Sequence, residues 1–356
     1  MRTAWAASPT ELARGHEVDE NVPTDLVRMK AIVCQEYGPP EVLQFNEVER
    51  PAPKKNEIRI RVVATTAARG DCELRGLAVP TLLRFMMRIA FGFQGPRRKI
   101  LGQELAGEIE SVGINVKLFK KGDQVFALTG LHLGAYAQYD CLPEKGLVAI
   151  KPSNMSFEEA AAVPVGGLHA LHFLSKGDIR SGQKVLIIGA GGSIGTFAVQ
   201  IAKSLGAEVT GVDVAGKLEV VRYIGADHVI DYTRKDFTKE GELYDVIFDT
   251  VGRSSFSRCI RSLEENGRYL LGNPGLSQQV RAKWTSMTSS KKVIGGTVSY
   301  KAEDMYRLRE LIEAGKVRSI IDRRYPLEKM VEAHKYVDSG QKKGNVVITI
   351  SSGLEG

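Results

Sequence analysis

Glycines at positions 189, 191, 192 and 195 have a spacing suited to holding phosphate groups. They follow the apolar run 184–188 and precede a helical pattern of apolar residues, 193–205, that ends at Gly206. Glycine permits a tight turn, close approach of the backbone to a pyrophosphate, and close packing of helix on strand. We therefore expect a dinucleotide's phosphates to meet the first turn of this helix. The predicted contacts are Gly189, Gly191, Gly192, Ser193, Ile194 and Gly195.

An acidic residue strengthens the prediction of dinucleotide binding over a merely structural turn. Asp213 ends the next apolar run, 208–212, about 20 residues after the glycines, where a carboxylate can accept hydrogen bonds from ribose hydroxyls. Lys217 follows on the next predicted helix and could approach a phosphate on the ribose. Gly272 and Asn273, after a later strand, complete the predicted cofactor contacts.

The surrounding pattern predicts an α/β fold with two domains. Six short apolar runs alternate with helical segments between residues 184 and 294, which indicates a doubly wound parallel sheet of six strands. Before it, alternating strands such as 57–64, 104–112, 124–127 and 135–142 indicate a mostly antiparallel β domain. We expect a flexible extension over 1–28, a β-rich catalytic domain over 29–150, the cofactor domain over 151–298, and a return to the catalytic domain over 299–356.

Composition narrows the class of protein. The 356 residues are 43% hydrophobic and 26% charged, which is ordinary for globular domains. Four well-separated cysteines without a CxxC pair argue against disulfides or a cysteine-rich zinc lobe, and predict a reducing, cytoplasmic location. No apolar run reaches 18 residues, so no membrane span is expected. The net charge of +7 is spread through the chain, so we expect a small-molecule substrate rather than nucleic acid as partner.

The segment 82–99 is apolar, contains five basic residues and has no acidic one. It is compatible with a helix on a membrane surface or with a flap over a substrate pocket. The short apolar part favours the flap. This interpretation places Phe85, Met86, Met87, Ile89 and Phe91 near the substrate mouth and favours bulky apolar acceptors.

Several longer motifs resemble one family. They are MKAIVCQEYGPPEVL, GQELAGEIESVG, KKGDQVFA, GAYAQY, the glycine turn, GADHVIDY and KKGNVVITI, which together cover nearly all of residues 29–350. The chain resembles the medium-chain dehydrogenase/reductase superfamily, especially its zinc-free quinone reductase and enoyl reductase-like branch. The resemblance implies a GroES-like β-rich catalytic domain beside a Rossmann cofactor domain.

The resemblance also bears on metal. In zinc-dependent relatives, ligands come from a Cys-His-Thr-Asp stretch and a Gly-His-Glu stretch. Here those stretches read Ala68-Arg69-Gly70-Asp71 and Gly102-Gln103-Glu104, and the usual third ligand position falls near Val165. Catalytic zinc needs about three protein ligands. We therefore expect a site without zinc, and we expect Cys72 to be a packed thiol.

The family implies hydride transfer from NAD(P)H to a quinone or an α,β-unsaturated carbonyl, whose product anion is delocalised and needs no Lewis acid. Candidate catalytic residues by this resemblance are Asp71, Tyr136 and His169. Each has a structural alternative: Asp71 as a turn cap, Tyr136 as core, His169 as a helix residue. The alternatives for the whole protein are a metal-free alcohol dehydrogenase and a catalytically silent, cofactor-binding protein that binds RNA.

Two further expectations follow from the resemblance. Many zinc-free relatives use NADPH and carry a serine after the second strand, whereas this chain has Asp213 and Val214 there, so NADH is favoured over NADPH. Lys217 and Arg222 could partly offset the carboxylate. Relatives pair through the edge of the cofactor sheet, so the apolar segment 292–299 predicts a homodimer.

Overall fold

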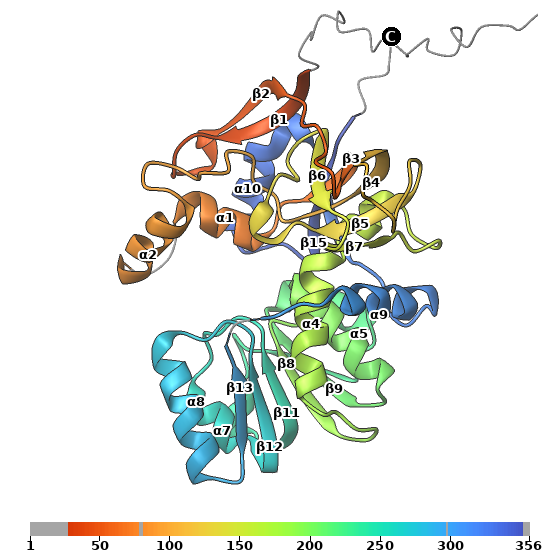
Figure 1. Ribbon diagram of the computed structural model, residues 1–356. Coiled ribbons are helices and arrows are strands. Elements are labelled where there is room, and N and C mark those ends of the chain that lie inside the picture. The colour runs from red at the N-terminus through yellow and green to blue at the C-terminus, as the bar shows by residue number, and fades with distance from the viewer. Residues whose placement is uncertain (1–27, 78–80, 297, 352–356) are drawn as a thin grey trace, which may run out of the picture.

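The computed structural model describes residues 28–77, 81–296 and 298–351, which form two lobes stacked one above the other (Figure 1). The predicted N-terminal extension lies outside the described residues, except for Arg28, which begins strand β1. Each lobe is built around one main sheet. Helix α4 (Pro164–Lys176) lies between them and contacts strands of both sheets.

The cofactor lobe contains the predicted sheet of six parallel strands. Their order is β10-β9-β8-β11-β12-β13, so the direction of winding reverses between β8 and β11. Ligands of doubly wound folds bind outside the carboxyl ends of the strands at such a point. The strands are β8 (Lys184–Ile188), β9 (Glu208–Asp213), β10 (His228–Asp231), β11 (Tyr244–Asp249), β12 (Leu263–Leu271) and β13 (Lys292–Gly295).

Helices cover both faces of this sheet, which explains its continuous apolar strands. Val185, Ile187 and Phe248 pack with α4 and α5, whereas Leu186 and Tyr269 pack on the opposite face with α7. The helices of this lobe are α5 (Ser193–Ser204), α6 (Leu218–Tyr223), α7 (Phe256–Arg261), α8 (Leu276–Thr288) and α9 (Ala302–Glu313).

The other lobe holds a seven-stranded sheet and a separate antiparallel pair, β1 with β2. The main path runs β14-β15-β3-β4-β5-β7, and β6 pairs with β3. The strands are β1 (Arg28–Cys34), β2 (Leu43–Glu49), β3 (Glu57–Thr66), β4 (Glu104–Val112), β5 (Gln124–Leu128), β6 (Tyr139–Pro143), β7 (Leu147–Ile150), β14 (Ile321–Pro326) and β15 (Asn345–Thr349).

Among the described residues, four α-helices complete the catalytic lobe: α1 (Arg69–Gly76), α2 (Thr81–Phe91), α3 (Phe157–Ala161) and α10 (Met330–Asp338). The capping box at the start of α3 is confirmed, since the Ser156 hydroxyl accepts from the backbone N–H of Glu159. Helix α3 packs against β3 and β4. Within the described residues, no helix has the length and apolar character needed to cross a membrane.

The structure differs from the prediction at one strand and at one helix. The strand predicted over 135–142 is wrong in its first half, because Gly134 has a φ of 107° and regular pairing starts only at Tyr139. Helix α8 has no counterpart in the prediction. Its apolar residues Val280, Trp284 and Met287 are exposed, so α8 lacks the buried stripe by which helices are recognised in a sequence.

Candidate active site

The glycine turn has the geometry expected of a phosphate-binding loop. Gly189 adopts a φ of 78°, and a side chain at Gly195 would lie 2.1 Å from the carbonyl oxygen of Gly189. Gly192 is the N-cap of α5 and has no side-chain cap, and a β-carbon there would meet nothing closer than 3.5 Å. Ser193 and Ile194 open the helix. The first turn of α5 therefore presents backbone N–H groups to an anion.

A loop from the end of the chain closes over this turn. The N–H of Gly344 donates to the carbonyl oxygen of Gly191 at 2.8 Å, and the Ser193 hydroxyl donates to that of Gly344 at 3.0 Å. The Lys342 ammonium donates to the Ser193 hydroxyl at 2.6 Å, which places a cation at the start of α5. The pKa of Lys342 is lowered to about 8, mainly by burial and secondarily by the positive charge of Lys217.

Asp213 ends β9 as predicted, but its carboxylate already has partners. One oxygen accepts the N–H of Gly191 at 2.8 Å and the other accepts that of Val214 at 2.8 Å. The Lys217 ammonium lies 4.0 Å from this carboxylate and donates to the carbonyl oxygen of Gly340 at 3.0 Å. Asp213 thus stabilises the glycine turn. The remaining lone pairs of its carboxylate oxygens can still accept hydrogen bonds from the hydroxyls of a ribose.

Gly272 and Asn273 lie just beyond the carboxyl end of β12, beside the switch point. The N–H of Gly272 donates to the carbonyl oxygen of Asp249 at the end of β11. Gly252 packs so closely on Asn273 that a β-carbon would lie 2.4 Å from the Asn273 carbonyl oxygen. The predicted cofactor residues are therefore gathered at one edge of the sheet.

Asp71 and Tyr136 are brought together, but inside the catalytic lobe. Both side chains are fully buried, and the Tyr136 hydroxyl donates to Asp71 at 3.0 Å. The same hydroxyl lies 3.1 Å from Nε2 of His334. Burial raises the pKa of Asp71 to about 6. The direct catalytic role of Asp71 and Tyr136 remains a prediction, and the burial of both side chains favours a positioning role.

Sequence reasoning missed His334 because it lies 198 residues from Tyr136. Its other ring nitrogen, Nδ1, is 3.3 Å from the Cys72 sulfur and 3.2 Å from the Arg75 guanidinium, which also donates to Asp338 at 2.6 Å. Burial lowers the pKa of His334 to about 3, so its imidazole is neutral. Cys72 is a buried thiol, and burial raises its pKa.

The residues at the zinc-ligand positions of relatives do not fit that metal. Ala68 has no donor atom, and the Gln103 amide donates to Asp71 at 3.3 Å. Val165 is apolar, and its backbone N–H donates to buried Glu104 at 2.7 Å. The described residues include no group of three or more His, Cys, Asp and Glu side chains placed to hold a metal ion. The donor set therefore cannot build a tetrahedral zinc site.

His169 lies one helical turn after Val165, so both residues share a face of α4. Its Nδ1 makes a short hydrogen bond with the hydroxyl of Tyr300, a residue that the sequence did not single out. Burial lowers the pKa of His169 to about 4, and burial together with the charge of Glu104 raises that of Tyr300. At neutral pH the pair is therefore uncharged and hydrogen-bonded.

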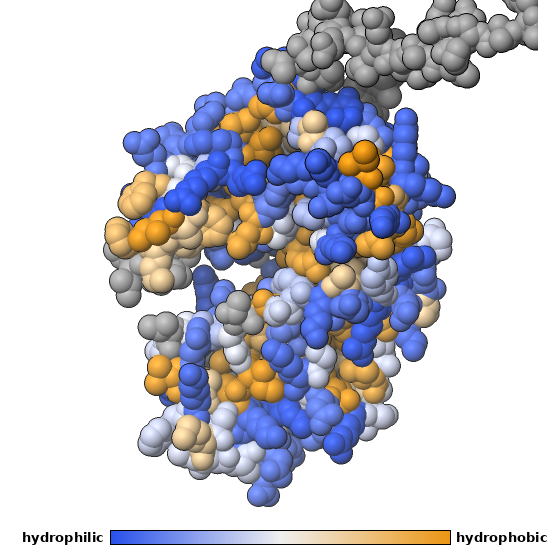
Figure 2. All heavy atoms as spheres, in the orientation of Figure 1, coloured by the Kyte–Doolittle hydropathy of each residue, from blue (hydrophilic) through white to orange (hydrophobic). Residues whose placement is uncertain are grey.

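The segment expected to form a substrate flap includes helix α2. Met87 and Phe91 face inward and pack against the catalytic-lobe core, whereas Phe85, Met86 and Ile89 are exposed. Only part of the predicted apolar set is thus free to meet a substrate. The space-filling view shows a hollow between the two lobes, and α2 projects above it (Figure 2).

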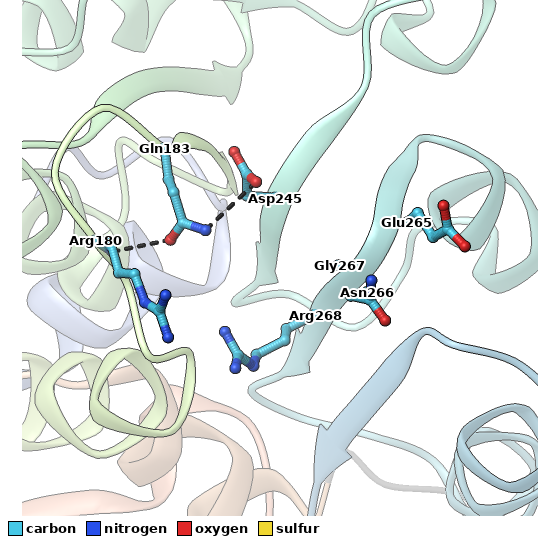
Figure 3. A pocket seen from close by; sticks show the side chains of 7 residues that line it. All are labelled: Arg180, Gln183, Asp245, Glu265, Asn266, Gly267 and Arg268. Atoms are coloured by element: carbon cyan, nitrogen blue, oxygen red, sulfur yellow. Dashed lines mark hydrogen bonds between the residues drawn. The ribbon is translucent and has the colours of Figure 1, made fainter.

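A separate pocket of about 190 Å³ lies at the opposite edge of the cofactor sheet, lined by Arg180, Gln183, Asp245, Glu265, Asn266, Gly267 and Arg268 (Figure 3). The Gln183 amide bridges the backbone N–H of Arg180 and the carboxylate of Asp245 there. This edge carries the amino ends of β8 and β11, so it is not the edge where doubly wound folds bind cofactors.

Three family models match the chain. They are described as Alcohol dehydrogenase GroES-like domain over residues 54–152, Alanine dehydrogenase/PNT, C-terminal domain over 165–253, and Zinc-binding dehydrogenase over 224–348. The first confirms the GroES-like character predicted for the catalytic domain.

Individual relatives cover nearly the whole chain. The Chloroplast envelope quinone oxidoreductase homolog of Arabidopsis thaliana is 32% identical over 90% of this chain and 98% of its own length. The 2-methylene-furan-3-one reductase of Solanum lycopersicum is 31% identical over 90% of this chain and 79% of its own. The structure of the quinone oxidoreductase from Coxiella burnetii superposes with a TM-score of 0.81 at 26% identity, covering 91% of this chain and all of that one. The chain belongs to the medium-chain dehydrogenase/reductase superfamily, among its quinone oxidoreductase-like members.

Proposed function

We propose that this protein is a zinc-independent NAD(P)H-dependent oxidoreductase that reduces a quinone or an α,β-unsaturated carbonyl compound. The observation that carries the proposal is the donor set at the metal positions of relatives, where Ala68, Gln103 and Val165 offer no site for zinc. The names of the quinone oxidoreductases and of the 2-methylene-furan-3-one reductase among its relatives support the same acceptor classes.

Residues of the chain can bind the cofactor and orient the acceptor for this reaction. The first turn of α5, Lys342 and Asp213 would hold the cofactor, which supplies a hydride when bound. With Tyr300 donating to Nδ1 of neutral His169, the imidazole carries its proton on Nε2, where it can donate to the acceptor's carbonyl oxygen. The second N–H of the Gln103 amide, held in place by Asp71 and Tyr136, is another donor.

Such donors suit conjugated acceptors. Hydride addition to a quinone or enone leaves a delocalised phenolate or enolate, which neutral hydrogen-bond donors can stabilise and solvent can protonate. A localised alkoxide from a simple ketone would need a protein acid nearby. Neutral His169 and Tyr300 are weak acids at neutral pH, because the pKa of His169 is lowered to about 4 and that of Tyr300 is raised, so the pair favours acceptors whose product anion is delocalised.

The experiment that tests this function measures NADH and NADPH oxidation with 1,4-benzoquinone, an enone, a saturated ketone and an aldehyde. We expect turnover with the first two only. Tyr300→Phe should lower kcat about tenfold, the loss of roughly one hydrogen bond in the transition state, without changing cofactor affinity. Turnover of the saturated compounds would favour a metal-free alcohol dehydrogenase. Salt-sensitive RNA binding without turnover would favour the silent RNA-binding alternative.

Metal content gives a direct prediction. Purified protein should contain far less than one zinc per chain by elemental analysis, because two of the three ligand positions lack any suitable donor atom. Dialysis against a chelator should leave quinone reduction unchanged. One zinc per chain, with activity that disappears on chelation and returns with zinc, would contradict the proposal.

Lys342 makes cofactor binding depend on pH. Its pKa of about 8 lies below the ordinary value for lysine, so the ammonium next to Ser193 loses its proton as the pH rises through that value. We expect the Kd for NADH to rise about tenfold between pH 7 and pH 9, from the loss of one charge beside the phosphates. Lys342→Arg should remove this dependence. Lys342→Met should bind NADH about tenfold more weakly than the wild type at pH 7, with little difference between the two at pH 9. An identical pH profile for the wild type and both variants would show that Lys342 does not face the phosphates.

We also propose that the protein forms a homodimer through β13. This strand is an edge of the cofactor sheet and pairs only with β12 among the described strands. An unpaired edge favours association with a second copy. Light scattering at micromolar concentration should give twice the chain mass. Val298→Asp, which places a charge in the apolar segment 292–299, should give monomers. A monomeric wild type would contradict this. A cytoplasmic location remains a further prediction.

A further inference from the structure

Helix α2 exposes an apolar face that nothing in the described structure covers. The exposed side chains are Phe85, Met86, Ile89 and, just after the helix, Phe93, with exposed fractions of 59%, 60%, 49% and 58%. Phe85 and Phe93 pack edge to face, with ring centroids 6.4 Å apart, so the two aromatic rings form one exposed apolar cluster. A monomeric protein rarely gathers large apolar side chains on its surface without a binding role.

The position of this helix is fixed by polar contacts at its carboxyl end. The Tyr37 hydroxyl donates to the carbonyl oxygen of Gly92 at 2.9 Å, and the Arg97 guanidinium donates to that of Ile89 at 3.1 Å. Met87 and Phe91 pack on the lobe beneath. These contacts fix the orientation of α2, so its apolar face points to solvent and cannot pack against the rest of the protein.

Helix α8 of the other lobe also exposes apolar side chains, two of which, Val280 and Trp284, line a pocket with residues of α7. Val280, Trp284 and Met287 recur at the spacing of one helical stripe and are 68%, 70% and 84% exposed. Helices α2 and α8 project on the same side of the molecule, one above and one below the hollow between the lobes (Figures 1 and 2). We call these seven exposed side chains the apolar rim: Phe85, Met86, Ile89, Phe93, Val280, Trp284 and Met287.

The stretches of sequence that carry the apolar rim contain basic residues and no acidic residue. Residues 74–103 and 266–302 contain 12 of the 49 Lys and Arg residues and none of the 42 Asp and Glu residues. The rest of the chain therefore has 37 basic against 42 acidic residues, a net charge of −5, although the whole chain is at +7. Arg88, Arg98, Lys283 and Lys292 are exposed beside the two helices. The positive charge is thus concentrated in the segments that carry the apolar rim.

We propose that the apolar rim docks on the surface of an anionic lipid bilayer. Aromatic and aliphatic side chains beside arginine and lysine are the combination that holds peripheral proteins in the interface of charged membranes. A substrate flap would need no such excess of charge, and the dimer contact proposed along β13 does not involve α2, which lies on the other lobe. Docking would hold the hollow between the lobes next to the lipid, whichever acceptor the enzyme reduces.

The test is sedimentation of the full chain with vesicles of phosphatidylcholine, with and without phosphatidylserine, over a salt series. We expect binding only to the anionic vesicles, weakening as salt rises. The double substitution Arg88→Gln with Arg98→Gln should weaken it about 25-fold, from about fivefold per charge. Phe85→Ser with Ile89→Ser, and separately Val280→Ser with Met287→Ser, should each weaken it about tenfold.

A matched control removes exposed apolar side chains elsewhere. Ile114 and Leu118, which are 87% and 59% exposed near the β4–β5 turn, can be changed to serine and should leave vesicle binding unchanged. The thermal unfolding temperature and the circular dichroism spectrum of every variant should match those of the wild type, which shows that the variants fold.

Three results would overturn the proposal. The first is absence of binding to anionic vesicles. The second is equal loss of binding in the control and the rim variants. The third is a change of oligomeric state or of the KM for bulky quinones in the rim variants with no change in vesicle binding, which would assign the rim to a second copy or to the substrate.

Discussion

Replacing Gly195 with alanine is expected to weaken the binding of nicotinamide dinucleotide about 100-fold and to lower thermal stability. A β-carbon at this position would lie 2.1 Å from the Gly189 carbonyl oxygen and within 2.7 Å of two backbone atoms of Ala190. Backbone atoms cannot rotate away as a side chain can, so α5 must move off the turn. Overpacking of this kind costs about 1–3 kcal/mol, and about 2.7 kcal/mol corresponds to 100-fold in Kd.

A neighbouring glycine separates the effect on the fold from the effect on the cofactor. A β-carbon at Gly192 would meet nothing closer than 3.5 Å, so Gly192→Ala should lose only the difference between glycine and alanine as N-cap, about 1 kcal/mol or less. The same methyl group would occupy the space where a pyrophosphate approaches the N-cap of α5, so Kd should still rise about tenfold. The measurements are titration of NADH fluorescence and thermal unfolding. Unchanged NADH affinity in both variants would show that phosphates do not bind at this turn.

Asp213→Ser is expected to change the cofactor preference from NADH to NADPH. The carboxylate at the end of β9 would lie against a 2′-phosphate, and one unfavourable contact between close charges costs about 2–5 kcal/mol, or roughly 30-fold or more. The ratio of kcat/KM for NADH to that for NADPH should therefore fall by at least about 30-fold. Lys217, 4.0 Å from the carboxylate, would then be free to pair with the phosphate.

The Asp213 carboxylate accepts hydrogen bonds from the backbone N–H groups of Gly191 and Val214. Because serine removes these bonds as well as the charge, a control variant is needed. Asp213→Asn keeps one oxygen that can accept from Gly191 but removes the charge. If charge sets the preference, both variants should shift the ratio in the same direction. A wild type that prefers NADPH, with a ratio that neither variant changes, would show that Asp213 does not face the ribose.

Short-range patterns predicted the cofactor half of this protein well. Buried parallel strands appear as continuous apolar runs, and the glycine turn must stand between such a run and a helix, so the six strands and the start of α5 could be placed from the sequence. Asp213 was found by the same logic, since it lies a fixed number of residues beyond the turn.

The remaining parts of the site depend on contacts between distant segments. Tyr300 meets His169 across 131 residues, His334 meets Tyr136 across 198, and Lys342 meets Ser193 across 149. No local periodicity marks these three residues, because their roles arise only when the segment before α9, helix α10 and the loop before β15 pack against earlier parts of the chain. Asp71 and Tyr136 could be identified as a pair, but only the packing shows that both are buried.

The most direct test of the central claim is the position to which deuterium is transferred. Protein dialysed against a chelator is incubated with 4-deuterated reduced nicotinamide cofactor and a cyclic enone, and the product is examined by mass spectrometry and NMR. We predict a saturated ketone with deuterium on the β-carbon, formed at the rate of undialysed protein. Deuterium on the carbonyl carbon of an allylic alcohol, or turnover that requires added zinc, would contradict metal-free reduction of a conjugated acceptor.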